Sequence, residues 1–313
     1  MKNLFLVIAI TVIIFIFSLI NGAVSFDNLT IRLLLDIRLP RVLTAFLIGG
    51  MLALSGSILQ LILRNPLADG FTTGISASAA LGAAISIGLG LNLLSIPLVA
   101  IAFAIAGLFA IFKLTSMDKS FHYTTVILAG IIVNIICSAI ISFLKYYFDE
   151  SIGSIIFWLM GGFYVVSYER VFTLFLVLSF CFFLLFKDSL KLNIMAYDFK
   201  TASSLGLDIA KERKKLFVIV AVLIAFAVSF SGIIGFVGLI IPHIVRGLFK
   251  PDMKTHLLYS TLFGANFLLL SDTFCRIVIP SGAELPVGVA TSFIGGIFFI
   301  FLMKYRLKSI WYG

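Results

Sequence analysis

An uncharged run of 22 residues, from Val42 to Leu63, is long enough to cross a lipid bilayer as one helix. About 20 apolar residues in a helix span the roughly 30 Å hydrocarbon core. Small residues punctuate the run, among them Gly49 and Gly56, and they would let neighbouring helices approach its backbone closely. Gln60 is a polar side chain in the same run, and lipid offers it no hydrogen-bond partner. The run therefore predicts a transmembrane helix inside a bundle of other helices.

The rest of the chain has the composition of a membrane protein. Of its 313 residues, 61% are hydrophobic and 12% are charged, and the mean hydropathy is +1.19. A typical soluble domain has about 25% charged residues. The composition therefore predicts an all-α polytopic membrane protein. The formal charge of +9 does not indicate nucleic-acid binding, because the basic residues lie in short loops and form no single patch.

Apolar runs recur along the chain and predict ten crossings of the bilayer. The shortest, Phe236–Ile244, follows Gly235 and contains Pro242, as expected of a broken helix that faces a cavity. With ten crossings and a cytoplasmic N-terminus, 17 Lys and Arg residues fall in cytoplasmic loops and 6 fall outside. This distribution follows the positive-inside rule and predicts that both termini are cytoplasmic. The runs are approximately 4–20, 42–63, 73–91, 93–112, 123–144, 171–186, 216–234, 236–244, 257–270 and 286–303.

The ten predicted helices divide into two halves of five, about 1–150 and 151–313. A short sequence echo favours a repeat, since a Ser-Gly pair precedes a proline by the same spacing in 55–66 and in 231–242. Each half has an odd number of crossings, so two such halves would be inverted relative to each other, as in many transporters. We expect one transmembrane domain over 1–313, built from two inverted five-helix repeats.

The longest polar interruption runs from Lys187 to Lys215 and carries seven of the 17 cytoplasmic charges. Within about 188–215, the pattern predicts a short helix from Asp198 to Leu205, a break at Gly206 and a second short helix capped by Asp208. Such a helix–glycine–helix element could dock on a cytoplasmic partner. Composition alone favours the alternative of an ordinary solvated loop.

Seven motifs resemble those of the FecCD-type permeases, the membrane subunits of ABC importers for iron–siderophore complexes, haem and vitamin B12. They stand in family order and cover the chain from about Arg38 to the C-terminus. The resemblance implies the type II ABC importer permease fold, with ten helices in each subunit. The motifs are RLPR at 38–41, NPLAD at 65–69, LAG at 128–130, FWLMGG at 157–162, ASSLGL at 202–207, SGIIGFVGLIIPHIVR at 231–246 and ELPVG at 284–288.

The resemblance also implies a division of labour among subunits. A second permease, identical or paralogous, would complete a central pathway, two cytoplasmic ATP-binding subunits would hydrolyse ATP, and an extracytoplasmic substrate-binding protein would deliver the cargo. The sequence has no G-x-x-x-x-G-K-[ST] phosphate loop, so ATP and Mg²⁺ would bind to the partner ATPase, and we expect no cofactor or metal on this chain. We therefore expect a transport subunit, not an enzyme, in the cytoplasmic (inner) membrane of a bacterium.

Arg38, Arg41 and Arg276 fall on the outer side in this topology. By resemblance they would meet glutamates of the binding protein, and a guanidinium group does pair bidentately with a carboxylate. The alternatives are that each arginine reaches the lipid headgroups, or that Arg276 pairs with Asp272 one turn earlier. Glu284 is either a proton-relay acid or part of the N-terminal cap of the last helix.

Four residues align with the family's cytoplasmic gate: Asn65 and Leu67 at the inner end of the second helix, and Tyr123 and Thr124 at the start of the fifth. Short side chains at a constriction can open through small helix shifts. The alternative for the first pair is that Asn-Pro only ends a helix.

A further group aligns with the element that fits a cleft of the ATPase. Gly206 would permit the turn there, since glycine readily adopts positive φ. The resemblance favours this coupling role over the solvated loop. The group comprises Ala202, Leu205, Gly206 and Leu207.

The expected cargo is an iron–siderophore complex, because ferric siderophores are the commonest cargo of the family and a neutral channel suits a bulky chelate; haem and cobalamin are alternatives. An ion-coupled secondary transporter is a different class that inverted repeats would also suit. Such a transporter should carry ionisable residues at mid-span. The predicted mid-spans offer Asn134, Asn266 and Gln60 but almost no charge, which favours the ABC importer.

Overall fold

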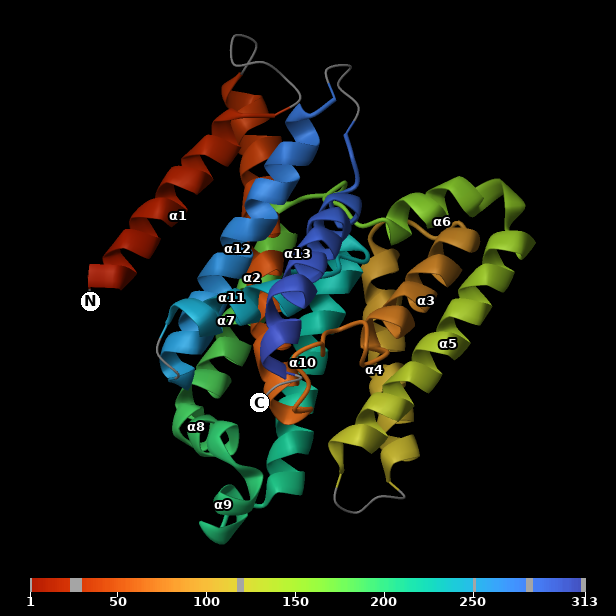
Figure 1. The fold of residues 1–313 in the computed structure, drawn as a ribbon. Helices are drawn as coiled ribbons and strands as arrows, with labels where there is room; N and C mark the ends of the chain where they lie inside the picture. The colour runs from red at the N-terminus through yellow and green to blue at the C-terminus, as the bar shows by residue number, and fades with distance from the viewer. Residues whose placement is uncertain (1, 23–29, 117–120, 250–251, 280–283, 311–313) are drawn as a thin grey trace.

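The computed structural model describes the chain except residues 1, 23–29, 117–120, 250–251, 280–283 and 311–313, and the described part is a helical bundle (Figure 1). We call its two ends upper and lower, as drawn in Figure 1: α6 lies near the upper end, and α8 and α9 lie at the lower end. The helices are α1 (Lys2–Ile20), α2 (Leu39–Ile62), α3 (Ile75–Gly88), α4 (Ser95–Thr115), α5 (Tyr123–Tyr147), α6 (Ile152–Leu159), α7 (Tyr168–Lys187), α8 (Ser189–Tyr197), α9 (Phe199–Ser204), α10 (Ile209–Ser231), α11 (Val237–Leu248), α12 (Met253–Ile277) and α13 (Val287–Ile310).

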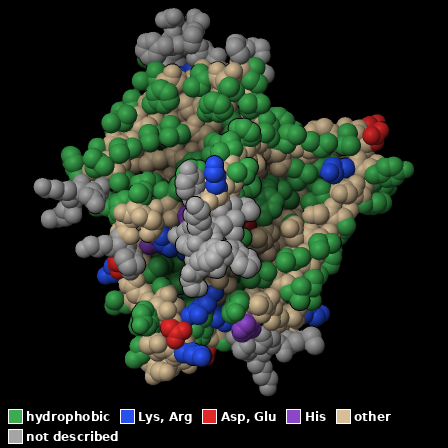
Figure 2. Space-filling view, in the orientation of Figure 1, with side chains coloured by type: hydrophobic (Ala, Val, Ile, Leu, Met, Phe, Trp, Pro, Cys, Tyr) green, Lys and Arg blue, Asp and Glu red, His purple; other side chains and the backbone are tan. Residues whose placement is uncertain are grey.

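Ten of these helices, all but α6, α8 and α9, coincide with the ten predicted apolar runs. By length and composition, five helical stretches of the described chain are able to cross a membrane, and α1, α3, α11 and α13 are shorter apolar helices. The tenth, α12, has 25 residues and carries polar side chains. Figure 2 shows hydrophobic side chains over most of one face, with the visible charges mostly in the lower half. The predicted all-α polytopic fold is confirmed.

Helix α2 lies within the bundle, as its small residues predict. Of its most apolar 18-residue window, 89% is buried. Gly49 faces the backbone of Gly264 in α12, and Gly56 faces that of Gly238 in α11; a β-carbon at either position of α2 would overlap a carbonyl group. Gln60 donates from Nε2 to the Gly238 carbonyl oxygen at 3.0 Å. Close backbone approach and a hydrogen bond to the broken segment thus hold α2 in place.

The helix that contains α2 begins earlier than predicted. Residues Leu33–Arg38 form a π-helical turn that runs directly into α2. Pro40 is accommodated in the first turn of α2, where a missing backbone N–H costs little. Arg38 and Arg41 are therefore helical residues and not part of a loop leading into the membrane.

The sequence echo that favoured a repeat falls on unlike local structures. The first Ser-Gly pair, 55–56, lies in the middle of α2, whereas the second, 231–232, lies where α10 ends and Gly232 has a φ of +68°. Pro66 follows α2 in a loop, but Pro242 lies inside α11. The echo therefore does not coincide with matching local structure. The repeat boundaries near residue 150 stay a prediction.

The polar segment 188–215 differs from its prediction in two ways. An unpredicted helix, α8, occupies Ser189–Tyr197. Asp208 does cap a helix, accepting a hydrogen bond from the Lys211 backbone at 3.0 Å, but that helix is α10, which continues to Ser231. The expected second short helix is thus the first turns of a long one. A continuous helix therefore runs from just after the α9 turn into the bundle.

Candidate functional site

The predicted coupling residues form a tightly capped helix end at the lower end of the bundle. Asp198 caps α9 by accepting from the Thr201 backbone N–H at 3.0 Å. At the other end Gly206 has a φ of +85°, its N–H donates to the Ser203 carbonyl at 2.9 Å, and the Leu207 N–H donates to the Ala202 carbonyl at 3.1 Å. This is the Schellman pattern, in which glycine terminates a helix. The predicted break at Gly206 is confirmed.

The side chains of this element divide between the interior and the surface. Ala202 is fully buried and Leu207 is half-buried against the apolar core. Leu205 is 66% exposed, and a β-carbon at Gly206 would have no neighbour within 4 Å. A rigid turn at the end of the molecule thus presents a leucine and open space beside it. These are the properties of a surface that a partner can cover, although the coupling role itself stays a prediction.

The first turn of α9 is held by two arginines. The guanidinium carbon of Arg64 lies 4.0 Å from the centre of the Phe199 ring, and that of Arg213 lies 4.3 Å from it. Arg64 also pairs with Asp198 at 3.2 Å. Arg213, which is buried, donates to the Phe121 carbonyl at 3.3 Å. α9 is therefore joined to the end of α2, to α10 and to the chain entering α5.

The predicted gate residues lie in two turns next to these contacts. Asn65 accepts a hydrogen bond from the Leu67 backbone N–H at 2.9 Å, which closes a short turn after α2, and Leu67 is 51% exposed. Tyr123 begins α5, with its ring 5.9 Å from the Arg213 guanidinium. Thr124 is exposed, and its hydroxyl lies 2.7 Å from His122 Nδ1. α2 ends at Ile62, before Asn-Pro, as the helix-stop interpretation requires, while the gating role stays a prediction.

Two lysines and two acids join the start of α8 to the start of α10. Lys191 pairs with Glu212 at 2.9 Å and lies 3.7 Å from Asp188, and Lys215 pairs with Asp188. Burial acts to raise the pKa of the Asp188 carboxyl, but the hydrogen bond and charge of Lys215, followed by Lys191, outweigh it and lower that pKa. The hydrogen bond and charge of Glu212 raise the pKa of Lys191. The Asp188 carboxylate and the Lys191 ammonium group are therefore both charged at neutral pH.

At the upper end, Arg41 lies against two acids. Its Nη2 is 2.9 Å from Asp272 Oδ1, and its Nη1 is 2.7 Å from Glu284 Oε2. Asp272 is fully buried and also lies 2.9 Å from Nε of Arg276. The predicted alternative pairing of Arg276 with Asp272 is thus confirmed. Glu284 is neither an isolated acid nor a simple cap, because it is bound to Arg41.

Arg38 and Arg276 also contact backbone carbonyls of α1 and of the residue after it. Arg38 donates to the Leu19 and Ile20 carbonyls, and Arg276 donates to those of Ser18 at 3.0 Å and Asn21 at 2.8 Å. These carbonyls end a helix, where the last backbone acceptors lack intrahelical partners. Both arginines are buried, with at most 5% exposed. Their predicted docking role stays a prediction, and Arg41, at 12%, is the most exposed of the three.

Three of the sequence motifs meet through glycines. A β-carbon at Gly161 would overlap the Ile233 carbonyl, one at Gly232 would overlap the Trp158 carbonyl, and one at Gly288 would overlap the Met160 carbonyl. The motifs around 157–162, 231–235 and 284–288 therefore share one junction where backbones touch. Only glycine permits so close an approach.

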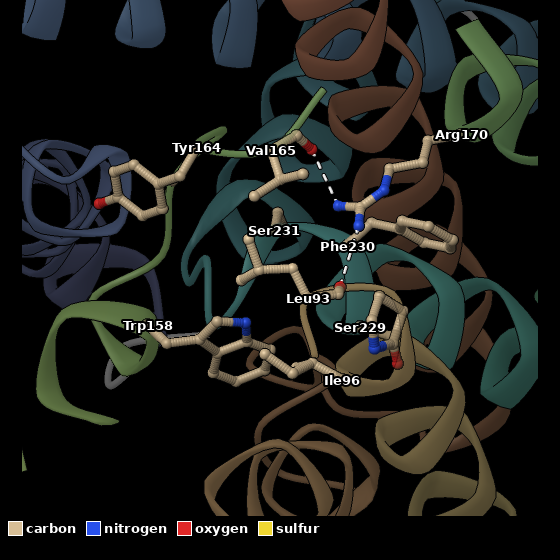
Figure 3. A pocket seen from close by; sticks show the side chains of 11 residues that line it. Leu93, Ile96, Trp158, Tyr164, Val165, Arg170, Ser229, Phe230 and Ser231 are labelled. Carbon is tan, nitrogen blue, oxygen red and sulfur yellow. Dashed lines mark hydrogen bonds between the residues drawn. The ribbon is translucent and has the colours of Figure 1, made fainter. Parts of the chain in front are cut away.

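A small cavity lies beside this junction (Figure 3). Its volume is about 50 Å³, and Trp158, Tyr164 and Arg170 are among the residues that line it. Arg170 donates to the Val165 carbonyl at 2.9 Å and to the Leu93 carbonyl at 3.1 Å, as the dashed lines in Figure 3 show. The arginine thereby joins the loop before α7 to the loop before α4. The cavity is far too small for a chelate.

Comparison with known proteins identifies the family and the fold of this chain. The sequence matches the FecCD transport family over residues 3–305. The chain belongs to this family. A solved metal-chelate type ABC transporter in an inward-facing conformation has 34% sequence identity and a TM-score of 0.89, over 97% of this chain and 99% of that one. The match confirms the type II ABC importer permease fold and shows that this FecCD chain is a transport component.

Relatives of this FecCD permease differ in their cargo. A probable iron chelatin permease of Helicobacter pylori is 36% identical over 89% of this chain and 84% of its own length. A molybdate permease of Haemophilus influenzae is 35% identical over 91% and 85%, and a vitamin B12 permease of Vibrio parahaemolyticus is 35% identical over 96% and 93%. The family is thus established, whereas the cargo does not follow from these similarities.

Several residues of the site were not found by sequence reasoning. Phe199 was one apolar residue among many, and nothing marked it as the centre of a charged cluster. Asp272 was considered only as a partner of Arg276, although an acid inside an apolar span signals that several groups must surround it. Gly288 was noticed only as part of a motif. Each acquires its role through contacts with residues that lie far away in the sequence.

Proposed function

We propose that this chain is the membrane-spanning subunit of an importer that carries a ferric siderophore across the inner membrane of a bacterium. The observation that carries the proposal is the capped turn at α9. It presents Leu205 at the lower end of the bundle, and the ion pairs of Arg41 and Arg276 with Asp272 lie at the opposite end. The chain belongs to the FecCD family. A separate pair of ATPase subunits would bind this turn and supply the energy for transport. ATP and Mg²⁺ would be bound to those subunits. The permease itself would do no covalent chemistry.

This proposal fixes the orientation of the bundle. The lower end faces the cytoplasm, together with both termini, and the upper end faces the binding protein. A second permease subunit, identical or paralogous, would complete the pathway. Of the three arginines, Arg41 is the best placed for docking, because its guanidinium borders the surface beside Glu284. Arg38 and Arg276 would first have to release the carbonyl groups near the end of α1.

A ferric siderophore is the proposed cargo for a physical reason. In the helices of the described chain the charges gather near the ends, which leaves the mid-spans almost uncharged. A wall of this kind would hold a bulky hydrogen-bonding chelate weakly enough to release it. Haem and cobalamin are the alternatives that the family implies, and molybdate joins them because of the Haemophilus relative.

Reconstitution tests the proposal. The chain is placed in liposomes with or without its ATPase and binding protein, and uptake of a radiolabelled ferric hydroxamate, haem, cobalamin or molybdate is measured. We expect uptake of the ferric chelate only when ATP, the ATPase and the binding protein are all present. Uptake of another cargo alone would replace the siderophore assignment. Uptake by the chain alone, driven by a proton or sodium gradient, would overturn the importer assignment.

A further inference from the structure

Phe199, at the start of α9, contacts two cationic groups that come from different parts of the bundle. Arg64 follows the end of α2, and Arg213 lies on α10, with their guanidinium carbons 4.0 and 4.3 Å from the ring centre. Cations are attracted to the negative face of an aromatic ring. Arg64 is also paired with Asp198. The aromatic ring is therefore a contact that both arginines share at α9.

Each arginine is attached to a strained turn. Arg64 itself has a φ of +45°, and Phe121, whose carbonyl accepts from Arg213, has a φ of +48°. Positive φ is uncommon for residues other than glycine, and it persists where surrounding contacts impose it. Only one further non-glycine residue of the described chain, Phe236, has positive φ. Strained backbone thus occurs at the two turns that the Phe199 cluster holds.

These two turns are also the ones that lead into the predicted gate. Arg64 immediately precedes Asn65 and Leu67, and Phe121 precedes Tyr123 by two residues. The Arg213 guanidinium is 5.9 Å from the Tyr123 ring as well. A displacement of α9 would thus change the contacts that hold both turns in their strained conformations. The same cluster touches the coupling element on one side and both gate segments on the other.

We propose that Phe199 is a positioning residue that links movement of α9 to the two gate turns. This inference rests on the proposed function, because it requires an ATPase that moves α9. When α9 shifts, Phe199 carries Arg64 and Arg213 with it or releases them, and the turns at Arg64 and Phe121 relax together. Two gate segments that are distant in sequence would then respond as one.

The test measures gate movement and ATP hydrolysis in the same assembled transporter. A spin label is placed at Leu67→Cys, which is well exposed, whereas the three native cysteines are buried. The permease is embedded in nanodiscs with its ATPase, and the label's mobility is compared with and without ATP. Phe199→Leu keeps the apolar bulk but removes the ring. Tyr197→Leu is the matched control, since Tyr197 is 83% exposed and lies two residues away.

We expect Phe199→Leu to co-purify with the ATPase and to hydrolyse ATP, while the ATP-dependent change at the label falls about fivefold or more. Tyr197→Leu and the conservative Phe199→Trp should keep the full change. Arg64→Gln, at a well-exposed position, is a second variant that removes one contact of the ring, and it should also reduce the change.

The outcomes separate two kinds of failure. If Phe199→Leu or Arg64→Gln keeps the full ATP-dependent change, the link through Phe199 is wrong while the importer assignment stands. If Phe199→Trp loses as much of the change as Phe199→Leu, the ring contributes only its shape and the inference is likewise wrong. If the unmodified transporter shows no ATP-dependent change at all, the proposed function fails, and this inference fails with it.

Discussion

The two ends of the bundle use the same chemistry, arginine paired with carboxylate, in opposite environments. At the upper end Asp272 is fully buried between Arg41 and Arg276. At the lower end Arg64 and Asp198 have side chains that are 42% and 34% exposed. Breaking a buried pair leaves an uncompensated charge, whereas an exposed pair contributes little. The comparison indicates that the buried charges around Asp272 are fixed, whereas the Arg64–Asp198 pair can separate at small cost.

Replacing Asp272 should have the largest effect. Asp272→Asn leaves two buried guanidinium groups without their shared carboxylate, and removing one partner of a buried pair typically costs about 3–5 kcal/mol. We expect a much lower yield of folded protein and a lower midpoint in thermal unfolding in detergent. Asp149→Asn, an exposed acid near the same end, is the control and should change neither. Equal stability of the two variants would show that the ion pairs of Asp272 with Arg41 and Arg276 do not stabilise the fold.

Gly206→Val should leave the fold intact and disrupt coupling. A side chain there meets no atom within 4 Å, but a φ of +85° strains a residue with a β-carbon by about 1–2 kcal/mol. We expect the variant to insert normally while transport per ATP hydrolysed falls about tenfold. Gly206→Asn should retain more transport, because asparagine tolerates positive φ. Normal transport by the valine variant would refute the coupling assignment.

Glu284→Gln tests the exposed border of the upper junction. Glu284 is 28% exposed and contacts one arginine, so neutralising it should cost about 1 kcal/mol or less. Glu284 pairs with Arg41 and competes with the binding protein for it. Removing the Glu284 charge should therefore strengthen docking of the binding protein, measured by surface plasmon resonance on the permease in nanodiscs. Arg41→Ala should weaken that docking. If neither variant changes the affinity, the binding protein does not contact Arg41.

The smallest effect concerns the four charges at the start of α8 and α10. The lowered pKa of Asp188 means that its stabilising contribution is present above the unfolded pKa, about 3.9, and is lost as pH falls through the folded value. The raised pKa of Lys191 means that its contribution is present below about 10.4 and is lost at higher pH. The protection factors of the α8 amides, which are exchange rates corrected for the intrinsic pH dependence of exchange, should therefore be largest between these limits. Asp188→Asn should abolish the loss of α8 protection at low pH. An unchanged pH profile would contradict the pairing of Asp188 with the two lysines.

Local features of the sequence predicted much of the fold. The uncharged length of α2, its small residues and Gln60 placed it inside the bundle, because these properties depend on what a bilayer allows at each position. Asp198 and Gly206 marked the ends of α9 because capping depends on neighbouring residues. The same signals failed at α8, whose nine residues have no clear amphipathic pattern, and at the π-helical turn before α2.

The paired charges could not be predicted in the same way. Arg41 and Asp272 are 231 positions apart, and Arg64 and Asp198 are 134 apart. Such contacts depend on how complete helices pack, and a single sequence contains no direct sign of which helices become neighbours. The pairing of Arg276 with Asp272 was foreseeable because residues four apart lie on one face of a helix. Long-range pairing, not local propensity, is what separates the site as predicted from the site as observed.

The sidedness of Leu205 tests the central claim most directly. A Leu205→Cys variant is treated with a membrane-impermeant maleimide in intact spheroplasts and in inverted membrane vesicles, with and without the co-expressed ATPase. The native cysteines are buried, and the side chain at 205 is 66% exposed, so labelling should report this site. We expect labelling only from the cytoplasmic side, and protection when the ATPase is bound. Labelling from the outside, or full labelling in the assembled complex, would contradict it.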